Sequence, residues 1–193
     1  MWAKSNRFPP KFPSLSAGLN LLLAVRNSDG ASIGNLGKAG GGGVIRDYHG
    51  DWVKRYSRSI GHTTSVLAEW WALRDELILA TQLGIDQLDV ELDAKVIVEL
   101  LNGAECPNRS YSPLLNDCKS LMASLVQVRV RHCFREANQC ADFLAKRGCN
   151  MVNNFVVFDS PPSAALYILL DSDKNGLYYY RHVASTLASV GNL

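Results

Sequence analysis

Hydrophobic and polar residues alternate along the chain with two different periods, and the changes of period predict a series of strands and helices. A first strand is expected over about residues 19–27, leading to Asp29 in or just after it. The segment "GGVIRDYHGDWVKRYSRSI" follows as two strands joined at "DYHGD". Together the three strands predict an antiparallel meander with these core candidates: Val44, Ile45, Trp52, Val53 and Tyr56.

The second half of the pattern combines helices with single strands. "TTSVLAEWWALRDELILATQLG" has helical spacing, with Thr64 or Ser65 as N-cap and Gly84 after its end. "QLDVELDA" alternates as a strand and "KVIVELLN" follows it as a helix; "PLLNDCKSLMASL", "VQVRVRHCF" and "NQCADFLAKRGC" then indicate helix, strand and helix. This order predicts an α/β fold with a mixed five-stranded sheet, in which parallel strands join the antiparallel meander and helices flank the sheet.

Length and composition predict a single domain. A chain of 193 residues with 47% hydrophobic residues can bury one sizeable core. We expect this domain at residues 24–160, after a disordered leader at residues 1–23. The pattern leaves open whether the tail at residues 161–193 is an added helix or unrelated sequence. The acid-free leader also allows organelle targeting, but an intracellular protein, nuclear or cytoplasmic, is the simpler interpretation.

Charge, cysteine spacing and glycine spacing exclude several classes of protein. The net charge of +2 is too small to imply a polyanionic partner by itself. The five cysteines are an odd number without CxxC spacing, which argues against a disulfide framework and a zinc site. No apolar run reaches the length of a transmembrane helix, so no membrane association is expected. The glycine-rich run leads into a strand, which argues against a phosphate-binding loop.

Four acidic residues stand out because each lies among apolar neighbours. Asp29 is placed at the first strand, Glu69 one turn into the first helix, Asp93 at the end of the fourth strand and Asp142 in the first turn of the last helix. Taken singly, such residues often start turns or cap helices. Together, four partly buried carboxylates would repel one another unless cations neutralised them. Their oxygens suit Mg²⁺, and a pair of ions about 4 Å apart can hold a phosphodiester.

The segments around these acids resemble a known family. "SDGASIGNLGKAGGGGVIRD", "AEWWALRDEL", "VELDAKVIVELL" and "VRHCFREANQCADFLAKRG" are similar to the four motifs of type 1 ribonuclease H. The similarity is greatest to the ribonuclease H-like domains of plant genomes, many of them derived from retroelements, and it covers roughly residues 24–160. It implies a monomeric, metal-dependent endoribonuclease that cleaves the RNA strand of RNA–DNA hybrids with two Mg²⁺ ions, or Mn²⁺ in their place.

The resemblance also implies roles for individual residues. Asp29, Glu69, Asp93 and Asp142 would be the catalytic metal ligands. His132, ten residues before Asp142, matches the position of a proton-shuttling histidine, although it also continues the apolar face of its strand. The glycine-rich turn would contact RNA 2′-hydroxyls and let a nucleic-acid backbone come close. Substrate-binding residues are expected at five positions: Gly30, Gly34, Asn35, Thr64 and Asn138.

Departures from the family pattern keep other interpretations open. Leu36 replaces the usual proline of the glycine-rich turn, and no basic segment follows the third motif, so hybrid affinity is expected to be low and salt-sensitive. A domesticated, weakly active or inactive nucleic-acid-binding module is therefore an alternative. A 3′–5′ exonuclease is less favoured, because such enzymes carry an Asp-x-Glu pair where this chain has Asp29 followed by Gly and Ala.

Overall fold

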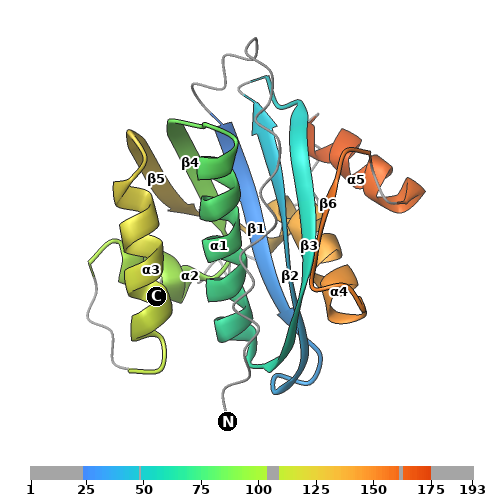
Figure 1. The fold of residues 1–193 in the computed structure, drawn as a ribbon. Helices are drawn as coiled ribbons and strands as arrows, with labels where there is room; N and C mark the ends of the chain where they lie inside the picture. Colours follow the sequence, from blue (N-terminus) through green and yellow to red (C-terminus); the bar gives the residue numbers. More distant parts are fainter. Residues whose placement is uncertain (1–23, 48, 104–108, 161–162, 175–193) are drawn as a thin grey trace, which may run out of the picture.

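The computed structural model describes residues 24–47, 49–103, 109–160 and 163–174. These residues form a six-stranded sheet in the order β5-β4-β1-β2-β3-β6, with helices on both faces (Figure 1). The strands are β1 (Ala24–Ser32), β2 (Gly37–Asp47), β3 (Trp52–Thr63), β4 (Gln87–Leu92), β5 (Gln127–His132) and β6 (Phe155–Phe158). The helices are α1 (Ser65–Gln82), α2 (Lys95–Leu101), α3 (Ser112–Ala123), the short 3-10 helix η1 (Arg135–Ala137), α4 (Gln139–Cys149) and α5 (Ala164–Lys174).

The strand pairing confirms the predicted mixed sheet. β1, β2 and β3 form the antiparallel meander, and β4 and β5 add parallel strands on the other side of β1. The sixth strand, β6, pairs antiparallel with β3 and was not predicted. Its four residues, "FVVF", are all half-buried and show no alternation, so their periodicity could not identify them as a strand.

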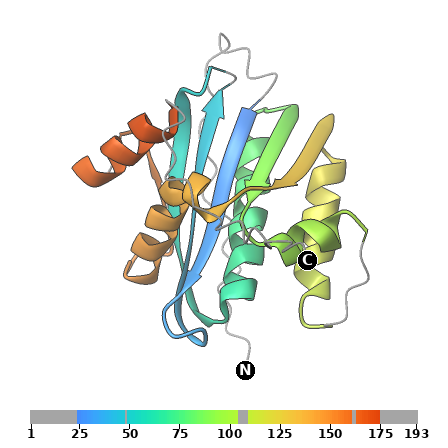
Figure 2. The ribbon, with the colours of Figure 1, turned by 180° about the vertical axis from the view of Figure 1, so that it is seen from behind.

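Helices cover the two faces of the sheet unequally. α1 and α3 lie on one face, and α4 and α5 lie on the other (Figures 1 and 2). The larger core lies under α1 and includes Trp70 and Leu77. On the opposite face, Leu166 and Leu170 of α5 pack with Cys140, Leu144 and Val44. The C-terminal tail, for which the sequence left the structure undecided, therefore contributes a packed helix. Residues 1–23, 161–162 and 175–193 lie outside the described residues.

Two details of the meander differ from the sequence-based predictions. Within the described residues, the first strand continues to Ser32, beyond Asp29, because its pairing with β2 runs on to Ala39. Trp52 was expected in the core but is 37% exposed, and it packs instead on the Arg55 guanidinium, whose Cζ lies 3.4 Å from the ring centroid. The other four core candidates are buried or partly buried.

The glycine-rich strand β2 makes room for a helix. A Cβ atom at Gly40 would lie 2.3 Å from the backbone nitrogen of Cys149, and one at Gly42 would lie 2.4 Å from that of Ala145. Both neighbours belong to α4, so these glycines allow the backbone of α4 to pack directly on the sheet. At these positions the prediction that glycine admits a nucleic-acid backbone is wrong, because a helix of the same chain occupies the space.

Candidate active site

Three of the four predicted acids meet at one place in the fold. Asp29 lies within β1, Glu69 lies one turn into α1, and Asp93 directly follows β4. One carboxylate oxygen from each residue lies within 4.8 Å of those of the other two. β1 and β4 are neighbouring parallel strands and α1 packs on β1, so this arrangement follows from the predicted topology.

Close packing of β1 on α1 sets the position of Glu69. A Cβ atom at Gly30 would lie 2.1 Å from the backbone nitrogen of Glu69, so only glycine fits between the strand and the helix. The backbone N–H of Gly30 also donates a hydrogen bond to the Glu69 carboxylate. Gly30 therefore positions the Glu69 carboxylate. It also lines the acidic pocket, and its contact with substrate there stays a prediction.

The carboxylates of Asp29 and Glu69 are buried, that of Asp93 is half-buried, and the three are short of hydrogen-bond donors. Asp29 is 3% exposed and Glu69 is 9% exposed. Burial and the neighbouring charges of Asp93 and Asp142 raise the pKa of Asp29 to about 8. Burial, Asp29 and Asp93 likewise raise the pKa of Glu69. Oε2 of Glu69 and Oδ1 of Asp93 are buried without a hydrogen-bond partner, an arrangement that a divalent cation with oxygen ligands would satisfy.

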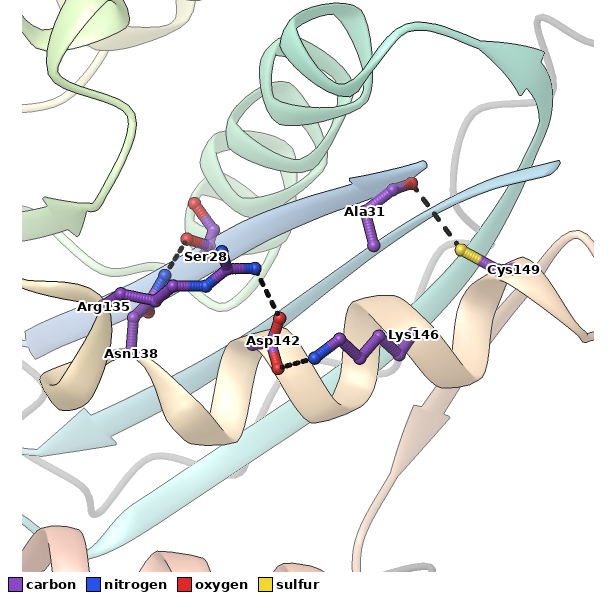
Figure 3. Close-up of polar contacts among 7 residues, drawn as sticks. All are labelled: Ser28, Ala31, Arg135, Asn138, Asp142, Lys146 and Cys149. Carbon is purple, nitrogen blue, oxygen red and sulfur yellow. Dashed lines mark hydrogen bonds and ion pairs between the residues drawn. The ribbon is translucent and has the colours of Figure 1, made fainter. Parts of the chain in front are cut away.

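The fourth acid, Asp142, lines the same pocket of about 320 Å³ but forms ion pairs with two basic side chains. Its Oδ1 lies 3.4 Å from Nη2 of Arg135, and its Oδ2 lies 2.6 Å from Nζ of Lys146 (Figure 3). Asp142 is not one of the three residues whose oxygens cluster. Sequence reasoning gave Lys146 no role, although its spacing of four residues from Asp142 on a helix indicates the pair.

Asn138 connects the last helix to the central strand. It is 1% exposed, and its Nδ2 donates a 3.0 Å hydrogen bond to the backbone oxygen of Ser28, next to Asp29 (Figure 3). This hydrogen bond holds the start of α4 beside β1, so Asn138 has a positioning role in the fold. Its contact with substrate stays a prediction.

His132 lies at the end of the edge strand β5. Its side chain is exposed and packs edge-to-face on Phe134, with ring centroids 5.8 Å apart, so it is not a core histidine. The pairing of β5 with β4 places it opposite Leu92, one residue before Asp93. His132 is not among the described residues that line the acidic pocket, and its catalytic role stays a prediction.

The predicted recognition turn is joined to the start of α1. Gly34 and Asn35 both have positive φ angles, of 90° and 54°, and the Ile33 N–H closes the turn on the oxygen of Lys38. Oδ1 of Asn35 accepts hydrogen bonds from the backbone and the hydroxyl of Ser65. Thr64 is the N-cap of α1, where its hydroxyl accepts from the N–H of Leu67.

Comparison with known proteins identifies the family. A family model described as "Reverse transcriptase-like" matches residues 27–148, which include all four predicted acids. The chain belongs to this reverse transcriptase-like family. The Arabidopsis thaliana protein named "Putative ribonuclease H protein At1g65750" is 35% identical over 143 residues, which are 74% of this chain. The resemblance to ribonuclease H inferred from the four motifs is thereby confirmed.

Solved ribonuclease H structures share the fold of this reverse transcriptase-like chain. The RNase H1 of Halobacterium salinarum is 27% identical with a TM-score of 0.64, covering 65% of this chain and 96% of that one. LC11-RNase H1, solved in complex with an RNA/DNA hybrid, is 26% identical with a TM-score of 0.59, covering 66% of this chain and 96% of that one. These similarities confirm the ribonuclease H-like fold.

The similarity concerns a domain within longer proteins in some relatives. The chain spans 23% of the length of the Arabidopsis thaliana relative. Within the residues that the structure describes, no helix combines the length and the apolar character needed to cross a bilayer.

Proposed function

We propose that this chain is a divalent-metal-dependent endoribonuclease that cleaves the RNA strand of RNA–DNA hybrids. The observation that carries the proposal is the cluster of Asp29, Glu69 and Asp93. One carboxylate oxygen from each lies within 4.8 Å of those of the other two, and two buried oxygens of these residues lack hydrogen-bond partners. Membership of the family and similarity to an RNase H1 solved with a hybrid support the choice of reaction and substrate.

The residues present fit two divalent cations. Asp29, Glu69 and Asp93 would hold Mg²⁺, or Mn²⁺ in its place, through oxygen ligands, and Asp142 would complete the set after leaving its two cationic partners. Bound cations would activate water, polarise the phosphodiester and neutralise charge on the leaving oxygen. Oε2 of Glu69 and Oδ1 of Asp93 lack hydrogen-bond partners, which leaves these two oxygens available for metal.

Substrate recognition is assigned to the turn and helix end beside the acids. The positive φ angles of Gly34 and Asn35 expose backbone groups of the turn, which suits contact with RNA 2′-hydroxyls. Thr64 at the N-terminus of α1 would receive a phosphate of the DNA strand. His132, on the strand beside the one that leads to Asp93, would move a proton between the site and solvent.

One observation favours a second candidate, a weakly active or inactive nucleic-acid-binding module. The ion pairs of Asp142 with Arg135 and Lys146 keep one of the four acids out of the carboxylate cluster. A chain in which these pairs persisted would bind nucleic acid with an incomplete metal site.

A cleavage assay separates the candidates. A hybrid labelled in turn on the RNA and the DNA strand is incubated with the protein and Mg²⁺, with EDTA and the Asp93→Asn variant as negative controls. Asp86→Asn is the matched control, because Asp86 is an exposed acid at the start of the same strand region. Internal cuts confined to RNA support the endoribonuclease. Binding without cleavage supports the module, and shortening from strand ends supports an exonuclease.

A further inference from the structure

The two cations that hold Asp142 also line a second hollow. Beside the acidic pocket lies a groove of about 420 Å³ between α4 and α5, and Arg135, Asp142 and Lys146 line both. Phe143 of α4 and Leu169 of α5 supply an apolar wall to the groove. The family match ends at residue 148, so α5 adds to this surface from outside the matched region.

Four charged side chains line this groove, and three of them, Arg135, Asp142 and Lys146, are paired with one another; the fourth is Glu136. The side chains of Arg135 and Lys146 are 66% and 62% exposed, and the side chain of Asp142 between them is 18% exposed. The acid is therefore the anchored member of the trio, and the two cations reach it from solvent. Removing Asp142 from the trio would leave two positive charges facing the groove with no acidic partner from this trio.

A metal ion and a phosphate group attract different members of the same trio. A divalent cation at the three clustered acids attracts the Asp142 carboxylate and repels the Arg135 guanidinium and the Lys146 ammonium. A phosphodiester attracts the two cations, and a guanidinium binds phosphate oxygens with strong charge-assisted hydrogen bonds. Binding of either ligand therefore frees the partner that the other ligand needs.

We propose that the Arg135–Asp142–Lys146 trio couples metal binding to nucleic-acid binding, and that the groove between α4 and α5 receives a phosphodiester of the hybrid next to the cleaved bond. Phe143 and Leu169 form the wall against which the adjoining sugar and base pack. This inference rests on the proposed function and adds a subsite and a mechanism of assembly to it. Since coupling is reciprocal, metal should raise hybrid affinity by the same factor by which hybrid raises metal affinity.

The coupling is measured on the full chain with Mn²⁺ and an unmodified RNA–DNA hybrid in the cold, after a gel confirms that this probe stays intact during the measurement. Mn²⁺ affinity is determined with and without the hybrid, and hybrid affinity with and without Mn²⁺. The double variant Arg135→Gln, Lys146→Met removes both cations. Lys95→Ala is the matched control, because Lys95 forms the same i,i+4 ion pair with Glu99 on α2, at 3.7 Å.

For the unmodified chain and the Lys95→Ala control we expect a coupling of about tenfold in both directions. The double variant should bind Mn²⁺ several-fold more tightly without hybrid, because Asp142 is already free. Its coupling should fall several-fold, to the part that direct attraction between the cations and the phosphodiester supplies. Coupling in the double variant equal to that of the Lys95→Ala control, or an Mn²⁺ affinity without hybrid equal to that of the unmodified chain, overturns the proposal.

A second variant tests the groove and leaves the charged trio unchanged. Leu169→Ala removes part of the apolar wall of the groove. It should weaken binding of the hybrid in Mn²⁺ several-fold and leave Mn²⁺ affinity without hybrid unchanged. Hybrid affinity equal to that of the unmodified chain would overturn the subsite. If the unmodified chain cleaved RNA but showed no coupling, this inference would fail and the proposed function would stand. If the unmodified chain neither cleaved RNA nor bound Mn²⁺, both would fail.

Discussion

Oδ1 of Asn35 accepts two hydrogen bonds from Ser65, one from the backbone N–H at 3.1 Å and one from the hydroxyl at 2.7 Å. These bonds join the tip of the β1–β2 hairpin to the first residue of α1. Glu69 lies four residues further along the same helix. The turn proposed to read the RNA and the helix that carries a metal ligand are therefore held as one unit.

Replacing Asn35 should loosen this unit in two separable ways. Asn35→Gly keeps the positive φ and removes the side-chain bonds, so we expect a loss of about 1 kcal/mol of unfolding free energy. Asn35→Ala adds the strain of a left-handed conformation, about 1 kcal/mol more. Urea unfolding of both variants measures the two effects. Equal stability of the glycine variant and the unmodified chain would show that the bonds to Ser65 contribute nothing.

Alanine at Gly30 should be far more damaging than alanine at Gly41. The added Cβ at Gly30 meets the backbone of α1 at 2.1 Å, whereas at Gly41 the nearest atom is the Ala72 side chain at 3.3 Å. We expect Gly30→Ala to lose about 3 kcal/mol or more, at the upper end of the cost of overpacking, and Gly41→Ala to lose less than about 1 kcal/mol. Urea unfolding compares them, and similar losses at the two positions would contradict the close approach of β1 and α1.

The sequence predicted the carboxylate cluster because each acid has a defined position on or next to a strand or helix that the pattern identifies. Asp93 follows the alternating strand β4, and Glu69 follows the N-cap Thr64 by five residues. Once β1 and β4 are parallel neighbours, their acids must lie close together. The partners of Asp142 were not predicted, although the spacing of four residues on a helix indicates the pair with Lys146. The pair with Arg135, which lies outside α4, depends on side-chain torsions and has no such signal.

Buried charge was the other feature that periodicity did not reveal. Arg58 of β3 forms an ion pair with Asp75 of α1, and both are buried, with Arg58 also facing the ring of Trp71 at 4.7 Å. A hydrophobic pattern assigns charged residues to solvent, so it cannot identify a pair that is buried because its members neutralise each other. The strand β6 was not predicted for a related reason, because a run of four apolar residues is too short to show a period.

Asn138 should act through position, and its replacement should show this. Asn138→Ala removes the donor to the Ser28 oxygen beneath the surface, and a lost hydrogen bond to a buried partner costs about 1–3 kcal/mol. We expect lower stability in urea and weaker metal binding, because α4 carries Asp142. The affinity for hybrid without metal should stay unchanged. A variant of full stability that binds hybrid poorly would instead show a direct contact with substrate.

The carboxylate cluster should make the metal-free protein less stable as pH rises. Burial and the neighbouring acids raise the pKa of Asp29 from 3.8 to about 8, so between these values the folded protein holds a proton that the unfolded chain has lost. The unfolding free energy therefore decreases with rising pH in this range, by at most about 1.4 kcal/mol per pH unit for one proton.

Asp29→Asn isolates this contribution, because the amide fills the same space and carries no proton to lose. In EDTA at pH 8 the variant should be more stable than the unmodified chain, and the two stabilities should converge towards pH 4. Adding Mg²⁺ should restore the stability of the unmodified chain at pH 8, since cations bind the ionised carboxylates, and should have little effect on the variant. Urea unfolding at several pH values, with and without Mg²⁺, tests both statements. If the unmodified chain were as stable in EDTA at pH 8 as at pH 5, ionisation of Asp29 would not destabilise the metal-free fold, and the raised pKa of Asp29 would be contradicted.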